Sequence, residues 1–166
     1  MRGRLVGVTD LDDWQARVDA FWADFDDSDP DGCLARMRAL VEERPPGDPF
    51  ALAEWGGVHD SLGLEAEAVE PYRRALAAGL PPEKAHQVTI QLASTLRNLG
   101  RYDEALALLG ELDAPELGDA PAFFRALVLH SAGRPAEALS VALTALAEHL
   151  PRYTRSARAY AADLVE

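Results

Sequence analysis

The sequence predicts an all-α fold: a right-handed α-solenoid of antiparallel helix hairpins, with about four hairpins and a C-terminal capping helix. The first observation is a repeat in which glycine, four residues and alanine recur at 63–68, 100–105 and 133–138. The steps between the glycines are 37 residues (100 − 63) and 33 residues (133 − 100). A period near ~34 residues is typical of stacked helix-turn-helix units. The second observation is that every long apolar pattern has the 3.6-residue period of a helix.

Small residues recur at one position in each predicted helix pair. Gly56 and Ala93 stand on the first helices of two pairs, and Ala68 and Ala105 stand on the second helices. Because these residues carry at most a methyl group, they let two helix backbones approach closely at a crossing. The repeated glycines supply the positive φ angle that ends the first helix of each pair.

Proline-rich stretches separate the predicted hairpins at 45–49, 81–82, 114–115 and 150–151, since a helix does not continue through them. We interpret residues 1–166 as one domain. It comprises a degenerate N-terminal hairpin at 11–44, repeats at 49–80, 86–114 and 119–150, and a capping helix at 152–166. Cys33 stands 35 residues before Ala68 (68 − 33), which places the first hairpin in register with the others.

The acidic composition limits the classes of partner. The formal net charge is −12, and residues 1–70 hold 17 Asp or Glu against 6 Arg. Such a chain repels phosphate backbones, so we expect no nucleic-acid partner. Residues 1–8 have an apolar run too short for a signal peptide, and no stretch approaches the ~20 apolar residues of a membrane span. With a single cysteine, the sequence predicts a cytoplasmic protein that does not bind membranes.

The repeat motifs identify a family resemblance. Leu52-x2-Trp55-Gly56-x2-His59, followed by Ala68-x3-Tyr72, resembles the consensus of the tetratricopeptide repeat (TPR) proteins. Runs such as His59-Asp60-Ser61-Leu62-Gly63, Ser94-Thr95-Leu96-Arg97-Asn98-Leu99-Gly100 and Leu150-Pro151-Arg152-Tyr153 are most similar to a small bacterial group of these proteins. That group has no assigned reaction. The resemblance therefore implies protein binding and no catalytic activity.

An acidic run near the N-terminus matches the start of a calcium loop. Asp27, Asp29 and Asp31 precede Gly32 in the order D-x-D-x-D-G, but the twelfth position of the loop is Arg38 where a bidentate Glu is required. The alternative is a capped turn, with Asp29 as N-cap of a helix that begins at Pro30. We favour the capped turn and expect no calcium site.

No other pattern predicts chemistry. The four histidines lie far apart in the sequence, without the spacing of a zinc site. The sequence lacks a G-x-S-x-G motif and a glycine-rich phosphate loop, and Cys33 lies on an apolar helix face, where we expect a buried thiol. We expect neither an enzyme nor a cofactor.

The remaining candidate site is the concave face, which the first helix of each pair lines in this family. Aligning the repeats places aromatic, amide, arginine and other side chains there: Phe50, Asp60, Gln87, Gln91, Ser94, Arg97, Asn98, Phe123, Leu127 and His130, joined by Arg152, Tyr153 and Arg155 at the start of the final helix. Such a mixture suits an extended peptide or a carboxylate. The alternative is that these side chains form an ordinary solvated face.

The sequence favours non-catalytic binding of a protein or peptide through this concave face, and we expect a partner with acidic or carboxylate groups. Two alternatives stay open. One is a scaffold or regulatory subunit that associates with itself, for example as a homodimer. The other is a domain that binds a metal or small ligand through the acidic N-terminal turn.

Overall fold

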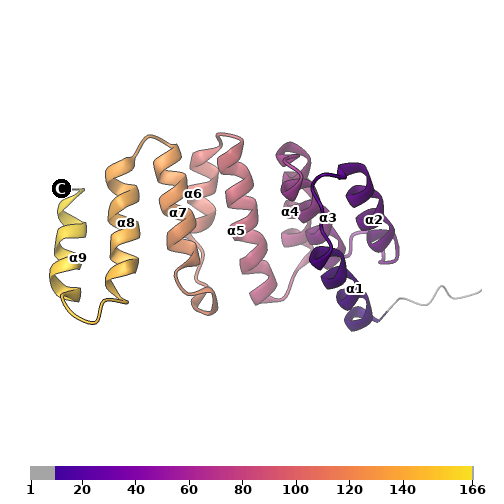
Figure 1. The fold of residues 1–166 in the computed structure, drawn as a ribbon, viewed down its shortest axis with the longest axis horizontal. Coiled ribbons are helices and arrows are strands. Elements are labelled where there is room, and N and C mark those ends of the chain that lie inside the picture. Colours follow the sequence, from indigo (N-terminus) through magenta and orange to yellow (C-terminus); the bar gives the residue numbers. More distant parts are fainter. Residues whose placement is uncertain (1–9, 166) are drawn as a thin grey trace, which may run out of the picture. The chain divides into compact units, whose positions relative to one another are not determined.

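The computed structural model describes residues 10–165, and within that range the chain forms nine α-helices, one short 3-10 helix and no strand (Figure 1). The predicted all-α class is therefore confirmed. By contact, the chain divides into two compact units, Met1–Leu80 and Pro81–Glu166. That residues 1–166 form a single domain stays a prediction. Residues 1–8, whose apolar run is too short for a signal peptide, lie outside the described residues.

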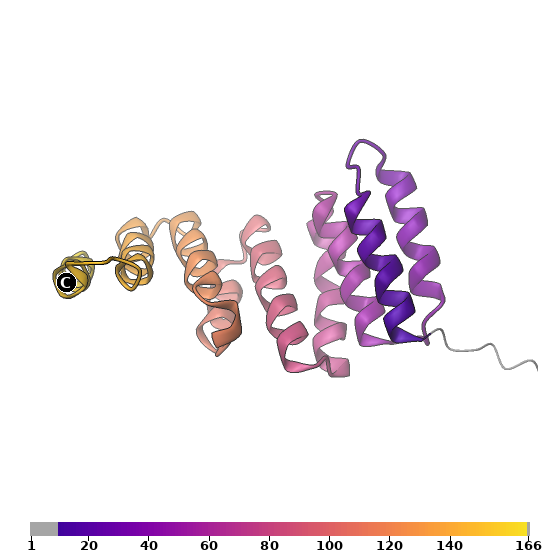
Figure 2. The ribbon, with the colours of Figure 1, turned by 60° about the horizontal axis from the view of Figure 1, so that its bottom comes forward.

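The first unit contains two antiparallel hairpins (Figure 2). Its helices are α1 (Leu11–Ala23), α2 (Pro30–Glu42), α3 (Pro49–Ser61) and α4 (Glu65–Ala78). Helix α3 packs against both preceding helices. Ala51 joins Trp14 and Val18 of α1 in one apolar cluster, and Val58 joins residues of α1 and α2 in another. Each hairpin in this unit is thus held by side chains that belong to its neighbour.

The contact between α3 and α4 depends on a glycine. Gly56 lies in the middle of α3, and a Cβ atom placed on it would stand 2.7 Å from Cδ1 of Tyr72 on α4. Tyr72 is fully buried. The prediction of a small residue at a helix crossing is confirmed here, and the group packed against it is an aromatic ring.

The second unit contains α5 (Pro82–Asn98), α6 (Tyr102–Gly110), the 3-10 helix η1 (Pro115–Leu117), α7 (Ala120–Ser131), α8 (Pro135–Ala147) and α9 (Thr154–Asp163). Helix α7 packs against both α5 and α6, as α3 does against α1 and α2. Helix α9 differs, because it packs against α8 and makes little or no contact with α7. The predicted capping helix therefore exists, but it covers only one helix of the last hairpin.

The repeat signature produces the same local structure each time. Gly63, Gly100 and Gly133 have φ angles of +72°, +73° and +74°, which confirms the predicted left-handed residue after each first helix. Ala68 and Ala105 are fully buried, as predicted.

The acidic N-terminal run forms the predicted capped turn. Asp29 is the N-cap of α2, and its Oδ1 accepts a hydrogen bond of 3.1 Å from the backbone N–H of Gly32. Pro30 is the first helical residue, and Asp31 is an acid in the first turn. Cys33 is buried, and its thiol donates a hydrogen bond to the Asp26 carbonyl.

Candidate protein-interaction groove

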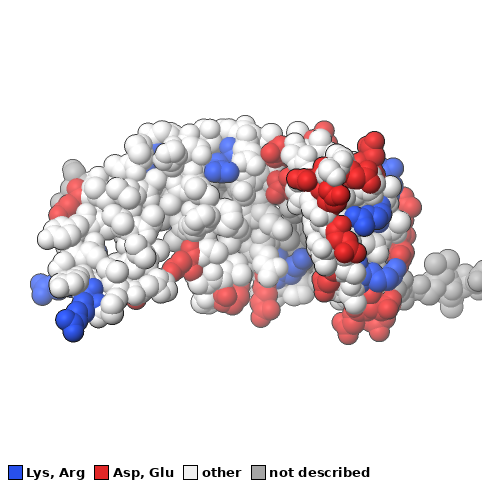
Figure 3. All heavy atoms as spheres, viewed as in Figure 1, with Lys and Arg blue, Asp and Glu red and all other residues white. Residues whose placement is uncertain are grey.

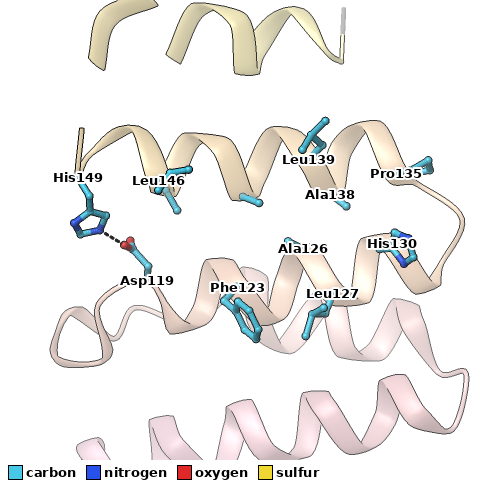
Figure 4. A pocket seen from close by; sticks show the side chains of 12 residues that line it. Asp119, Phe123, Ala126, Leu127, His130, Pro135, Ala138, Leu139, Leu146 and His149 are labelled. Carbon is cyan, nitrogen blue, oxygen red and sulfur yellow. Dashed lines mark hydrogen bonds and ion pairs between the residues drawn. The ribbon is translucent and has the colours of Figure 1, made fainter. Parts of the chain in front are cut away.

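An apolar hollow of the second unit lies across the last hairpin. It has a volume of about 480 Å³ and is formed entirely by α7, α8 and the residues that flank them. We call it the α7–α8 groove. Its lining residues are Asp119, Phe123, Ala126, Leu127, His130, Pro135, Ala138, Leu139, Ala142, Ala145, Leu146 and His149 (Figure 4).

The groove has a floor of small residues between two bulkier edges. Ala126 of α7 and Ala138 of α8 face the space between the two helices in Figure 4. Phe123 and Leu127 form the edge along α7, and Leu139 lies on the opposite edge. The small floor residues leave room that a neighbouring element can fill.

Three bulky apolar side chains of this groove are exposed to solvent. Phe123 is 59% exposed, Leu146 55% and Leu139 48%. Exposure of one large apolar side chain is ordinary for a protein surface, but several that line one hollow are characteristic of an interaction site.

The polar groups of the groove are confined to its ends. At one end, Nε2 of His149, just after α8, lies 2.5 Å from Oδ2 of Asp119, just before α7 (Figure 4). At the other end, His130 lies in the last turn of α7. The His149–Asp119 contact ties the start of α7 to the end of α8, and along the walls between the two ends every lining side chain is apolar.

Charged side chains are sparse over α7 and α8 on the face of the second unit shown in Figure 3, with Lys and Arg near the start of α9. The first unit, by contrast, has many Asp and Glu on the face shown. In the groove itself, no charged side chain belongs to the lining between the two ends.

Three of the residues predicted from the sequence line this groove: Phe123, Leu127 and His130. They lie on α7 at i, i+4 and i+7, which places them along one side of the helix. The structure thus brings together the part of the predicted site that comes from the last repeat.

The predicted residues on α5 do not line the groove. Gln87, Gln91 and Asn98 are exposed, whereas Ser94 and Arg97 are partly buried. A guanidinium N–H of Arg97 donates a hydrogen bond of 2.9 Å to the Asn98 side-chain oxygen. These residues form a polar stretch on α5.

The other predicted residues lie at the start of α9 or in the first unit. Arg152, Tyr153 and Arg155 are exposed where α9 begins, and Tyr153 has a φ of +71°, the only positive φ of a non-glycine residue in residues 10–165. In the first unit, Phe50 packs against the cluster of Trp14, Val18 and Ala51, and Asp60 is partly buried on α3.

Sequence reasoning missed the half of the groove that α8 contributes. Leu139 and Leu146 are seven residues apart and share one side of α8, while Ala138, Ala142 and Ala145 occupy an adjacent side. The available signal was that α8 is apolar over most of its circumference, which requires partners on more than one side. Because the family resemblance assigns only the first helix of each pair to the binding face, the sequence predicts this helix as ordinary core.

Outside the groove, one polar contact of the second unit joins α5 to the short helix η1. Nδ1 of His86 lies 2.5 Å from Oε1 of Glu116, and this hydrogen bond lowers the pKa of the Glu116 carboxyl. Across residues 10–165, no three His, Cys, Asp or Glu side chains converge so that they could hold a metal ion. Nor is any helix in this range both long and apolar enough to cross a membrane.

Comparison with protein families decides the identity of the fold. A family model described as tetratrico peptide repeat matches residues 49–164. The chain belongs to the tetratricopeptide repeat family. Repeats of this kind generally serve as protein-interaction modules, with binding surfaces built from stacked helix pairs. No curated protein and no solved structure matches the chain.

Proposed function

We propose that this tetratricopeptide repeat protein is a non-catalytic interaction module that binds a segment of another protein in the α7–α8 groove. The observation that carries the proposal is the exposure of Phe123, Leu139 and Leu146 within one hollow of about 480 Å³. Removing such side chains from water is the main source of affinity at protein interfaces. This proposal assigns binding only to the part of the predicted concave-face site that lies on the last hairpin.

The composition of the groove favours binding over catalysis. Its titratable side chains are Asp119, His130 and His149, and two of these already pair with each other. Catalytic sites place a nucleophile, an acid or a base beside the reacting group. In this groove the titratable side chains lie at the ends, and the floor is formed by alanines.

The partner that we propose also has acidic or carboxylate groups near one end of the groove. Arg152 and Arg155 are exposed, and Arg152 follows the groove residue His149 by three positions (152 − 149). Exposed charges of this kind steer association and weaken as salt screens them. Binding should therefore fall when salt is raised from about 0.05 to 0.5 M, while the apolar component persists.

The test begins with any partner recovered by affinity purification from the native cell. Phe123→Ala and Leu146→Asp should each weaken its binding at least about tenfold, because each removes an exposed apolar contact from the groove. Arg74→Ala, an exposed change on α4, is the control and should leave affinity unchanged. Circular dichroism should show that all variants retain their helices.

Two further variants define the extent of the site. Arg97→Ala and Asn98→Ala test whether it continues onto α5, where we predicted contacts from the sequence. Weakening by Arg74→Ala alone, or only by changes within residues 10–31, would place the binding surface elsewhere and refute the proposal.

Self-association is a second candidate, favoured by the outward face of α9. Tyr153 is 77% exposed and Tyr160 70%, and Leu164 follows Tyr160 by four residues. A terminal helix of a soluble repeat array normally has a polar outer face. Sedimentation equilibrium over a wide concentration range tests this candidate. A dimer that Tyr160→Ser dissociates would support it, and a monomer throughout would exclude it.

A further inference from the structure

From the groove itself we infer that the bound segment is an amphipathic α-helix of a separate protein, lying across α7 and α8. This inference rests on the proposed function and adds the conformation and pattern of the partner. A helix and an extended strand place different demands on such a surface. The structure distinguishes them by its polar groups, its dimensions and the way the other hairpins are covered.

The apolar lining of the groove disfavours an extended occupant. The lining side chains between the two ends of the groove are apolar, and the backbone N–H and C=O groups of α7 and α8 are committed to hydrogen bonds within those helices. An extended segment in this groove would bury its own backbone groups without partners, which is costly. A helix brings its backbone hydrogen bonds with it and can bury side chains there at no such cost.

The dimensions suit a helix. From Pro135 to His149 the groove follows α8 and its flank over 14 residue-to-residue steps (149 − 135), or about 21 Å at the helical rise. Its width spans two packed helices, whose axes lie about 8–10 Å apart in proteins. A helix of about 14 residues has three to four turns and fits this length. The alanine floor allows its backbone to approach closely.

The other hairpins show how such a surface is covered. Within each unit, the helix that follows a hairpin packs against both of its members: α3 against α1 and α2, and α7 against α5 and α6. Helix α9 instead packs mainly against α8, with Ala161 buried and Arg158 paired with Glu148. The position across α7 and α8 is the one that a following helix would take.

The pattern of the partner follows from the anchors. Phe123 and Leu127 on one edge and Leu139 on the other require apolar side chains at i, i+3 or i+4, and i+7 of the bound helix. Acidic residues at the end of the helix nearest His149 would face the exposed Arg152 and Arg155. A second copy of this chain is the alternative source of such a segment, and the oligomeric state distinguishes it in the experiment below.

The experiment is a display selection with two libraries of 18-residue segments that have identical composition. One library places its apolar residues at helical spacing, and the other places the same residues at alternate positions with a central proline. Both are selected against the native chain, the L146D variant and L99D. The last is a matched control, since Leu99 is also exposed and lies outside the groove in the same unit.

We expect segments only from the helical library, retained by the native chain and by L99D and weakened at least about tenfold by L146D. Retained segments should gain helical circular dichroism on binding, and those with acidic ends should bind R155E less well. Should L146D fail to fold, L139D takes its place as the groove variant.

Several outcomes would overturn the inference. They are selection from the alternating library, no selection from the helical library, or equal binding by L146D. A concentration-dependent dimer of the native chain that L146D abolishes would show that a second copy fills the groove. A native partner that depends on Leu146 but binds through a segment without helical structure would refute this inference and leave the proposed function intact.

Discussion

Replacing Gly56 by alanine should destabilise the first unit, although alanine is the better helix former. Gly56 lies in the middle of α3, and an added Cβ atom would stand 2.7 Å from Cδ1 and 2.8 Å from Cε1 of Tyr72. Carbon atoms in contact are normally about 3.5–4.0 Å apart. Since Tyr72 is 0% exposed, its ring has no open space into which it can move.

Two opposing contributions determine the size of the effect. Glycine in a helix interior costs about 1 kcal/mol relative to alanine, so the substitution gains up to that amount. Overpacking a filled core costs about 1–3 kcal/mol, and contacts this short with a buried ring fall at the upper end of that range. The free energy of unfolding should therefore fall by about 1–2 kcal/mol.

Urea unfolding followed by tryptophan fluorescence measures this change directly, because Trp14, Trp22 and Trp55 all lie in the first unit. Gly110→Ala is the control, and its unfolding is followed by far-ultraviolet circular dichroism because Gly110 lies in the second unit. Gly110 ends α6, and a Cβ atom there would meet no atom within 4 Å, so that variant should be unchanged or slightly more stable.

A second substitution tests the mechanism. If the loss arises from contact with the ring, combining Gly56→Ala with Tyr72→Leu should cost less than the sum of the two single changes. Equal stability of Gly56→Ala and the native chain, or strict additivity in the double variant, would show that the Tyr72 ring does not pack against Gly56 and would refute the reasoning.

Three further predictions concern the repeat packing, the acidic turn and a buried hydroxyl. Ala105→Leu should lower the free energy of unfolding by about 1–3 kcal/mol because Ala105 is fully buried, whereas exposed Glu111→Gln should not; equal effects in thermal unfolding would contradict this packing. Millimolar calcium should leave the melting temperature unchanged, because Arg38 stands where the bidentate Glu is needed, and a saturable shift that Asp29→Asn abolishes would disprove this. The Tyr72 hydroxyl has no hydrogen-bond partner among the described residues, and burial raises the pKa of this phenol. Because the pKa of Tyr72 is higher in the folded chain than in the unfolded chain, the stabilisation from keeping this phenol protonated is complete below the unfolded pKa of about 10. It is lost as the pH rises through the pKa of the folded state. Tyr72→Phe should remove this component of the pH dependence, as urea unfolding at neutral pH and above pH 10 will show.

The fold was predictable because its signals are local and repeated. The glycine after each first helix, the prolines between hairpins and the 3.6-residue period each determine structure within a few residues. The buried alanines at 68 and 105 follow from the same register. The group that packs against Gly56 was harder to predict. The sequence shows that a small residue is needed at this position but does not show that the Tyr72 ring covers it.

The candidate site was predictable only in part. Phe123, Leu127 and His130 could be placed by superimposing the repeats, since each repeat position faces the same way. The contribution of α8 could not be found in this way. Whether the apolar sides of a second helix are buried depends on what packs against them, and that depends on the position of α9.

The position of α9 explains why an apolar surface stays exposed in the last hairpin. Helix α9 is held by small contacts to α8, at Ala161 and through the Arg158–Glu148 ion pair, so it covers one side of α8. A capping helix placed as α7 is on the preceding hairpin would pack against both α7 and α8 and cover Phe123 and Leu146. The chain instead leaves these two side chains 59% and 55% exposed. Exposed apolar area of this kind promotes aggregation unless a partner covers it. The incomplete cap is therefore itself an argument that the α7–α8 groove is a binding surface.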